Sequence, residues 1–311
     1  MSFAQEVKTD ICKNELKPCC QKAQLSALIQ ICSSLSISSQ QLTLDIKTQN
    51  PTIAKRILFL LKQLYVTDTQ LSMFKQQKFQ KKHSYEIKVL SNVREILEDL
   101  TLLSDEGLAH HPRATLIRKD CCGRAYLAGA FLASGSINSP LSSNYHLEIA
   151  LGEKRLSDFV VKLLTHYEIN PKIIMRRNRY VIYIKQSEKI GDFLRLSGAY
   201  ESLMKFEDSR IQRDYINNLA RLDNCDIANE MKVQQSAARQ YEDILLIKKL
   251  IGLDKLDKKL LEVAELRIEN PDISLLELSR LYGKKYQETI SKSGIRHRIN
   301  KLHDIANRLK K

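Results

Sequence analysis

Length and charge limit the classes of protein that this chain can be. It has 311 residues and a formal net charge of +14, with 10 Gly, 6 Pro and no Trp. A chain of this length can bury two or three separate cores, and its low Gly and Pro content argues against a collagen-like or largely disordered protein. We find no apolar run of the ~18 residues that span a bilayer, and the N-terminus lacks a signal-peptide pattern.

The first two-thirds of the chain contains an internal repeat. CCQKAQL at 19–25 matches CCGRAYL at 121–127, and the same offset aligns Leu61 with Leu163 and Tyr65 with Tyr167. Both copies predict the same order of elements: a helix, an alternating strand, a second helix, a pair of strands and a short helix. In the first copy these are residues 20–36, 41–47, 51–65, 70–76 with 84–90, and 91–99. In the second copy they are residues 122–137, 145–151, 153–167, 172–177 with 180–185, and 187–197. Apolar and polar residues alternate along the strands, so each sheet has one buried face covered by helices and one open face. The pattern predicts a duplicated α+β fold around a pseudo-two-fold axis.

Cationic residues gather on the predicted hairpins. Arg176, Arg177 and Arg179 surround the turn of the second hairpin, and the matching region of the first copy carries Lys75, Lys78, Lys81, Lys82 and Lys88. Such cations suit a nucleic-acid backbone, and they are equally common as protection of a sheet edge. Both interpretations stay open at this point.

The cysteines predict a reduced protein without a metal or other cofactor. The seven are Cys12, Cys19, Cys20, Cys32, Cys121, Cys122 and Cys225, an odd number without a CxxC motif. An odd number of cysteines cannot all form disulfides within the chain, and this favours a reduced, cytosolic protein. Adjacent cysteines do not readily share one tetrahedral site, and no nearby His completes a finger spacing, so we expect small buried apolar side chains.

The C-terminal third is predicted to be helical. Residues 200–252 are charged and helical in pattern, with interruptions near 217–218 and 223–224, and a further helix starts near Leu256 and ends before Pro271. The next helix has a capping box, Ser274 with Glu277, and Gly283 marks its predicted end, about nine residues before the last helix. We therefore divide the chain into a duplicated domain at 1–215 (repeats about 19–100 and 121–197), a helical linker at 216–252 and a helix-turn-helix domain at 253–311.

The last helix is amphipathic and strongly basic. From Lys284 onward the chain has nine Lys or Arg and two acids. One stripe consists of Ile295, Ile299, Leu302, Ala306 and Leu309, and the rest of the helix carries the candidate DNA-binding residues Lys292, Ser293, Arg296, His297, Asn300 and Lys301, all within the segment Leu275 to Leu309. Arg and Asn can read base edges, whereas Lys and Ser suit phosphate oxygens. The alternatives are a helix that faces a protein, a helix that faces a membrane, and a solvated helix. The mixed polar face disfavours the membrane.

Residues 126–138 carry a resemblance. YLAGAFLASGSIN resembles the LAGLIDADG motif of homing endonucleases, with matches at Leu127, Ala128, Gly129, Ala133 and Gly135. The first copy, LSALIQICS at 25–33, is weaker. The motif at 126–138, the repeat, and the segments NCDIAN at 224–229 and SKSGIRHRINKL at 291–302 together make the whole chain resemble the WhiA family. These are bacterial proteins that join a LAGLIDADG-like domain to a C-terminal helix-turn-helix.

The resemblance implies a function without catalysis. In the endonucleases the last acidic residue of each motif binds a divalent metal, and here Cys32 and Ser134 stand at those positions. Neither offers the carboxylate oxygen that Mg²⁺ prefers, so we expect no cleavage and no metal there. The family implies a cytoplasmic protein at the nucleoid that binds double-stranded DNA. Relatives regulate transcription during sporulation in some bacteria, and act in cell division and chromosome segregation in others, the role we favour here.

Two rival hypotheses are kept. In one, the LAGLIDADG-like domain is a protein- or ligand-binding platform that the DNA-binding tail localises. In the other, the protein is a residual nuclease that uses carboxylates outside the motif. The target sequence, protein partners and oligomeric state do not follow from the sequence.

Overall fold

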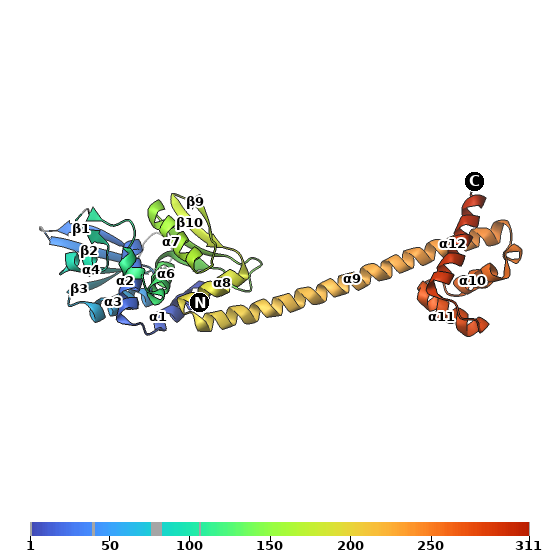
Figure 1. The fold of residues 1–311 in the computed structure, drawn as a ribbon, viewed down its shortest axis with the longest axis horizontal. Coiled ribbons are helices and arrows are strands. Elements are labelled where there is room, and N and C mark those ends of the chain that lie inside the picture. Colours follow the sequence, from blue (N-terminus) through green and yellow to red (C-terminus); the bar gives the residue numbers. More distant parts are fainter. Residues whose placement is uncertain (1, 39–40, 76–82, 106, 311) are drawn as a thin grey trace. The chain divides into compact units, whose positions relative to one another are not determined.

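The computed structural model describes residues 2–38, 41–75, 83–105 and 107–310 (Figure 1). The chain divides into two compact units, Met1–Arg213 and Asp214–Lys311, which we call the repeat unit and the helical unit. In the part of the chain described, we find no helix that is long and apolar enough to cross a membrane.

The repeat unit contains two copies of one arrangement of elements. The first copy consists of α2 (Pro18–Cys32), β1 (Ser33–Ser38), β2 (Gln41–Thr48), α3 (Pro51–Leu64), β3 (Thr69–Lys75), β4 (His83–Val89) and α4 (Val93–Asp99). The second consists of α6 (Asp120–Ser134), β7 (Gly135–Ile137), β8 (Leu147–Leu151), α7 (Lys154–His166), β9 (Lys172–Arg176), β10 (Arg179–Ile184) and α8 (Ser187–Ser197). Between them lie β5 (Leu103–Ser104), β6 (Gly107–Leu108) and α5 (Ala114–Ile117), and α1 (Phe3–Lys13) precedes them all. The predicted duplicated α+β class is confirmed.

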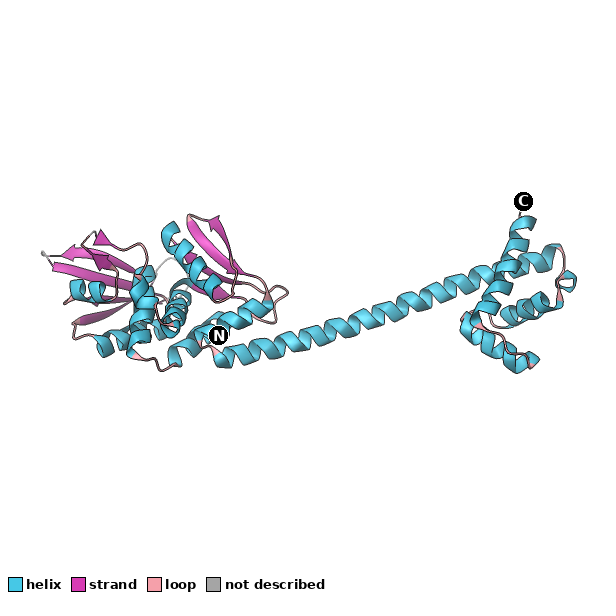
Figure 2. Cartoon of the chain, in the orientation of Figure 1, coloured by secondary structure: helices cyan, strands magenta, loops and turns pink. Residues whose placement is uncertain are grey.

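Each copy forms one antiparallel four-stranded sheet. The strand orders are β1-β2-β4-β3 and β7-β8-β10-β9, which are equivalent. The strands are the magenta arrows in Figure 2. Leu44, Ile46, Ile87 and Val89 of the first sheet and Leu147, Ile149 and Leu151 of the second are buried in one continuous core. The residues that alternate with them form an open face on each sheet.

The first strand of each sheet was not predicted. The expected helices 20–36 and 122–137 end instead at Cys32 and Ser134, and β1 and β7 follow them directly. Ser33 and Gly135 already have extended backbone dihedrals, with ψ of 162° and 152°. A strand that begins without an intervening turn residue leaves no local boundary signal in the sequence. Helix α1 was also missed.

The pair α2 and α6 forms the centre of the repeat unit. The two helices pack closely because Gly129 lacks a side chain: a Cβ there would lie 2.6 Å from the carbonyl oxygen of Gln24 and 2.9 Å from the Cβ of Ala27. Tyr126 is fully buried, and its hydroxyl donates a hydrogen bond of 2.8 Å to Gln30 on the facing helix. The small residues of the motif therefore set the distance between the two copies.

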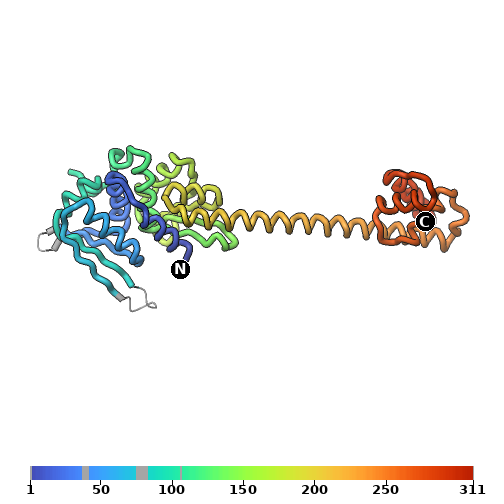
Figure 3. The backbone as a smooth tube through the Cα atoms, turned by 90° about the horizontal axis from the view of Figure 1, so that it is seen from below, coloured from blue at the N-terminus to red at the C-terminus, as the bar shows by residue number. Residues whose placement is uncertain are grey.

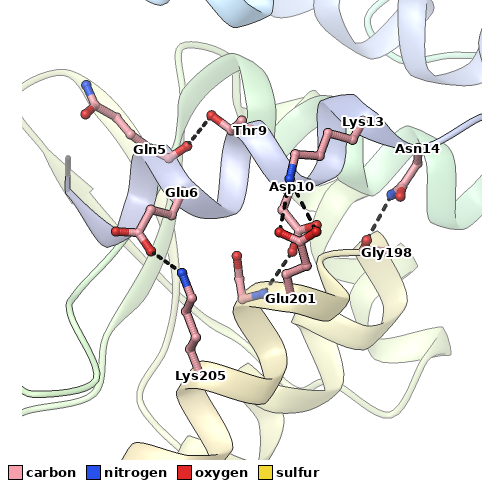
Figure 4. A network of polar contacts seen from close by, with 10 residues as sticks. Gln5, Glu6, Thr9, Asp10, Lys13, Asn14, Gly198, Glu201 and Lys205 are labelled. Carbon is pink, nitrogen blue, oxygen red and sulfur yellow. Dashed lines mark hydrogen bonds and ion pairs between the residues drawn. The ribbon is translucent and has the colours of Figure 1, made fainter.

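Helix α1 holds the start of the long helix α9 (Tyr200–Leu250) (Figure 4). The buried Asp10 accepts a hydrogen bond of 2.9 Å from the backbone N–H of Ser202, in the first turn of α9. Flanking contacts join Lys13 to Glu201, Lys205 to Glu6, and Asn14 to the carbonyl of Gly198. Helix α9 is continuous through 217–218 and 223–224, so the interruptions predicted there are absent.

The helical unit consists of the C-terminal part of α9, a short 3-10 helix (Leu253–Lys255), α10 (Lys258–Glu269), α11 (Leu275–Tyr286) and α12 (Lys292–Leu309). The three short helices gather at the end of α9 (Figure 3). Their core contains Ile244 and Ile247 of α9 together with Val263, Leu278, Tyr282, Ile295, Ile299 and Leu302. The C-terminal turns of α9 are thus part of this unit's core.

Candidate nucleic-acid interface

Helix α12 is fixed to its neighbours along the predicted apolar stripe. Ile295, Ile299, Leu302 and Ala306 are all buried in the core of the helical unit. Tyr282 of α11 lies beneath the helix, where its hydroxyl donates to Glu262 of α10 at 2.5 Å and its ring lies 5.0 Å from the guanidinium of Arg298. One buried tyrosine therefore connects α10, α11 and α12.

A carboxylate on α9 fixes the other side of α12. Asp243 is 6% exposed, and its oxygens lie 2.5 Å from Nδ1 of His303 and 2.9 Å from Nζ of Lys310. Burial alone would raise the pKa of Asp243, but the hydrogen bonds from His303 and Lys310 outweigh it, so the pKa lies below its usual value. The orientation of α12 therefore depends on a charged group on α9.

The connection between α11 and α12 is shorter than predicted. Helix α11 does not stop at Gly283 but continues to Tyr286, and Gln287 ends it with a left-handed φ of 55°. Ser291 caps α12 by accepting a hydrogen bond of 3.2 Å from the N–H of Gly294. Ser274 and Glu277 form the expected capping box of α11. The connection is therefore residues 287–291, which is shorter than predicted and about one residue longer than the simplest helix-turn-helix turn.

All six residues predicted to contact DNA are exposed on α12, namely Lys292, Ser293, Arg296, His297, Asn300 and Lys301. The ion pairs of the described residues include none of them. Lys292 and Arg296 line a hollow of about 190 Å³, which Lys232 of α9 and the first turn of α11 also line. Asn300 borders a second hollow, of about 360 Å³, beside Arg239 of α9.

Sequence reasoning missed three residues of this region. Lys232 and Arg239 belong to the predicted helical linker, for which the sequence indicated no role in binding, yet both lie beside α12. Arg267 is fully buried, and its guanidinium donates to the carbonyls of Asn270 and Ile273 at 3.3 and 2.7 Å, which orders the loop before α11. Burial lowers the pKa of Arg267. No local pattern marks these roles, because each depends on how the helices pack.

The repeat unit places Cys32 and Ser134 in one cleft. The cleft has a volume of about 880 Å³, and Lys8, Lys47 and Arg179 also line it. Its lining, as far as the chain is described, contains no carboxylate. Burial raises the pKa of the Cys32 thiol to about 11 and lowers the pKa of the Lys8 ammonium. The two degenerate motif ends therefore lie among cations rather than acids.

The open faces of the two sheets differ in charge. On the second sheet, the register places Lys172, Arg176 and Arg179 on the same face as a single acid, Glu148, which lies 3.2 Å from Arg176. Arg177 lies in the exposed turn between β9 and β10, with a φ of 51°. The predicted cations of the second hairpin are thus all exposed, although Arg176 already has a partner.

The first sheet is balanced by comparison. Its open face pairs Lys47 with Glu86 at 3.1 Å and Lys88 with Asp45 at 4.0 Å. Of the other predicted cations, Lys78, Lys81 and Lys82 lie outside the described residues, and so does the side chain of Lys75. The described part of this face therefore offers little free positive charge.

The two cysteine pairs meet in the structure, although they lie about 100 residues apart in the sequence. Cys19 and Cys20 begin α2, Cys121 and Cys122 begin α6, and their four Sγ atoms all lie within 4.8 Å of one another. Cys20 and Cys122 are buried as expected, but Cys121 is exposed. The packing of α2 against α6 creates this cluster.

Comparison with known proteins identifies the family. The WhiA N-terminal LAGLIDADG-like domain matches residues 18–103, the WhiA LAGLIDADG-like domain matches 123–216, and the WhiA C-terminal HTH domain matches 219–306. The chain belongs to the WhiA family. It is 43% identical over 311 residues to the "Probable cell division protein WhiA" of Bacillus licheniformis, covering 100% of this chain and 98% of that protein. The protein of the same name from Bacillus cytotoxicus is also 43% identical, over 312 residues.

Solved structures agree with this assignment. The full-length DUF199/WhiA from Thermatoga maritima is 26% identical and covers 99% of each chain, with a TM-score of 0.61. The isolated N-terminal LAGLIDADG domain of DUF199/WhiA, 22% identical, covers 63% of this chain and 90% of its own, with a TM-score of 0.51, and shows the fold alone. The predicted fold, two LAGLIDADG-like repeats followed by an all-α helix-turn-helix region, is confirmed. The WhiA C-terminal match starts within α9, whereas our boundaries at 215 and 252 stay a prediction.

Proposed function

We propose that this WhiA-family chain is a non-enzymatic DNA-binding protein that inserts α12 into the major groove of duplex DNA. The observation that carries the proposal is the polar face of α12. Its six candidate residues are exposed and outside the ion pairs of the described chain, while buried contacts hold the opposite face. A helix presented in this way fits the major groove, where side chains reach base edges.

Each candidate residue has a proposed role. Asn300 and Arg296 suit bidentate contacts with base edges, and the exposed His297 and Ser293 lie one turn apart on the same helix. Lys301 contacts phosphate, and Lys292 and Arg296 share a hollow with Lys232 that suits a phosphate group. The first turn of α12 adds free backbone N–H groups and the positive end of the helix dipole.

The repeat unit is proposed to add a weaker contact. The open face of the second sheet carries three cations against one acid, so it attracts a phosphate backbone without reading bases. Cleavage is not part of the proposal. The cleft between the motif ends is lined by Lys8, Lys47 and Arg179, which disfavour the binding of a divalent cation, and its described lining supplies no hard oxygen ligand of the carboxylate type.

The biological role follows from the relatives. The curated proteins at 43% identity bear the name probable cell division protein. We propose the same process for this chain, with chromosome segregation as its setting and the nucleoid in the cytoplasm as its location. Regulation of transcription through the DNA-binding helix is the mechanism that this surface favours.

A second candidate function is a platform for a protein partner. Strand β3 exposes Leu71, Met73 and Phe74, with 51%, 58% and 53% of their surfaces accessible. A group of exposed apolar side chains on an edge strand is a feature of protein interaction sites. In this alternative, α12 only localises the protein.

The test is a change of charge on α12 in the full chain. We expect Arg296→Ala with Lys301→Ala to weaken duplex-DNA binding by about 10- to 100-fold and to lower the salt slope by about one unit for each lost phosphate contact. The control is Lys248→Ala with Lys249→Ala, which removes the same charge from exposed positions near the end of α9. Equal losses of DNA affinity in both double variants would show that only the net charge of the protein matters. No loss of affinity in either variant would favour the alternative in which the chain is a platform for a protein partner.

A further inference from the structure

The four clustered cysteines occupy equivalent positions in the two repeats. Cys19 and Cys20 are the second and third residues of α2, and Cys121 and Cys122 are the second and third residues of α6. Within each pair the Sγ atoms are 4.0 Å apart, and all four lie within 4.8 Å of one another. Each helix therefore contributes half of a symmetric set of sulfur atoms.

This spacing is close to that of a four-thiolate metal centre. A tetrahedral Zn²⁺ site with Zn–S bonds of about 2.3 Å places its sulfur atoms about 3.8 Å apart. The sulfur atoms are 4.0 Å apart within each pair and at most 4.8 Å apart overall, so a contraction of up to about 1 Å reaches this geometry. Helix packing across the pseudo-two-fold axis supplies what two adjacent cysteines alone cannot, because the second pair approaches from the opposite helix.

The surroundings favour negative charge on sulfur. Lys17 and Lys119 precede α2 and α6 as their N-cap residues, and neither provides a side-chain cap for the first turn. The cluster therefore lies at the N-terminal ends of two helices, where the helix dipoles carry partial positive charge.

Four sulfur atoms that all lie within 4.8 Å of one another cannot all be thiolates without a cation between them, because like charges at this distance repel one another.

We propose that Cys19, Cys20, Cys121 and Cys122 bind one Zn²⁺ ion as a closed, structural site that fastens the two LAGLIDADG-like repeats together. Each Zn–S bond forms as the proton of that thiol leaves to water, and no electron is transferred. Four sulfur ligands leave no open position for substrate, so the site stabilises the fold and does not catalyse. Thiolate ligands exclude Mg²⁺ and Ca²⁺, which require oxygen.

The site has a defined structural consequence. It lies at the N-terminal ends of α2 and α6, and Gly129 lies on the part of α6 that packs against Gln24 and Ala27 further along the pair. Zinc would therefore fix one end of a helix pair that close packing fixes elsewhere. Removing the metal should loosen the packing of α2 against α6 before it unfolds the core that the two repeats share.

The experiment uses the full chain, purified under reducing conditions, stripped with a chelator and titrated with Co²⁺ and then Zn²⁺. We expect about one metal ion per chain, with the visible absorption of tetrahedral thiolate-bound Co²⁺, which Zn²⁺ then abolishes. The double variant Cys19→Ser with Cys121→Ser changes two ligands that are not buried, so the core remains intact. Because loss of one supporting partner already weakens metal affinity by about 10- to 100-fold, we expect this variant to bind more than ~100-fold more weakly.

The control is Cys225→Ser, which removes an exposed thiol outside the cluster and should bind metal like the unchanged chain. Zinc should also raise the melting temperature of the unchanged chain and of Cys225→Ser, but not that of the double variant. Equal metal binding by all three proteins would overturn the proposal. So would a reduced protein that takes up no zinc, or a disulfide between the two pairs that forms while no metal binds.

Discussion

The three cationic surfaces of this chain differ in how many of their charges are already paired. On α12, Arg296 and Lys301 are exposed and take part in none of the ion pairs formed by described residues. On the second sheet, Arg176 lies 3.2 Å from Glu148, and on the described part of the first sheet Lys47 and Lys88 each have an acidic partner. A charge with a partner must give up that partner, or share it, before it contacts phosphate. The three surfaces therefore form a graded series, in which α12 is the most available.

The largest effect is expected from reversing charge on α12. Arg296→Glu with Lys301→Glu replaces two attractive charges with repulsive ones, so duplex-DNA affinity should fall by more than ~100-fold at moderate salt. Fluorescence anisotropy with labelled duplex measures this loss. A loss smaller than that of the corresponding alanine variant would show that α12 does not face the DNA.

The second prediction concerns the support of α12 by α9. Asp243→Asn keeps the size of the side chain but removes the charge that His303 and Lys310 contact, and we expect it to reduce the free energy of unfolding by about 1–3 kcal/mol at neutral pH. Because the pKa of Asp243 is lowered in the folded state, its contribution is complete above the unfolded value and is lost as the pH falls below about 4.

Denaturant unfolding at several pH values measures this difference. The gap between the unchanged chain and Asp243→Asn should be present above about pH 5 and close as the pH falls below 4. Asp254→Asn, on the neighbouring 3-10 helix, is the control at a position without an ion pair in the described structure. A gap that stays constant down to pH 3 would contradict the proposed role of the charge.

The third prediction compares the two sheets directly. Arg176→Ala with Arg179→Ala should weaken DNA binding by about 3- to 10-fold, because it removes two of the three cations on the open face of the second sheet. Lys47→Ala with Lys88→Ala removes the same charge from the first sheet, where acids already balance it, and should change binding by less than about 2-fold. Equal losses of DNA affinity in the two variants would mean that both sheets face DNA. A larger loss in the first-sheet variant would mean that the first sheet, and not the second, contacts DNA.

The smallest expected change in DNA affinity tests the ion pair between Glu148 and Arg176. Glu148→Gln removes the acid beside Arg176 and should raise DNA affinity by about 2-fold, with a slightly steeper salt dependence. The same change at Glu86 on the first sheet serves as the comparison. If Glu148→Gln lowers the affinity instead, Glu148 orients Arg176 for binding and does not compete with the DNA.

The sequence was most informative where one helix carried its own signals. The stripe from Ile295 to Ala306, the Ser274 capping box and the small residues around Gly129 each indicated a contact that the structure contains. These features repeat at helical spacing or within one turn, so they can be read locally.

Features that depend on distant segments could not be read in this way. The strands β1 and β7 follow helices without a turn residue, and α11 passes through Gly283 because tertiary packing overrides a local stop signal. The partner of Arg176 lies on another strand, the pocket beside Arg296 includes a residue of α9, and the cysteine cluster requires two helices to meet. The helices and strands could therefore be predicted better than the residues that surround each candidate side chain.

The most direct measurement is a salt titration of duplex-DNA binding by the full chain, its α12 variant Arg296→Ala with Lys301→Ala, and its sheet variant Arg176→Ala with Arg179→Ala. If α12 is the principal reader, its variant should lose most of the affinity and lower the salt slope by up to about two units, while the sheet variant loses less of both. An α12 variant with unchanged affinity and slope, beside a sheet variant that no longer binds, would place DNA on the repeat unit and refute recognition by α12.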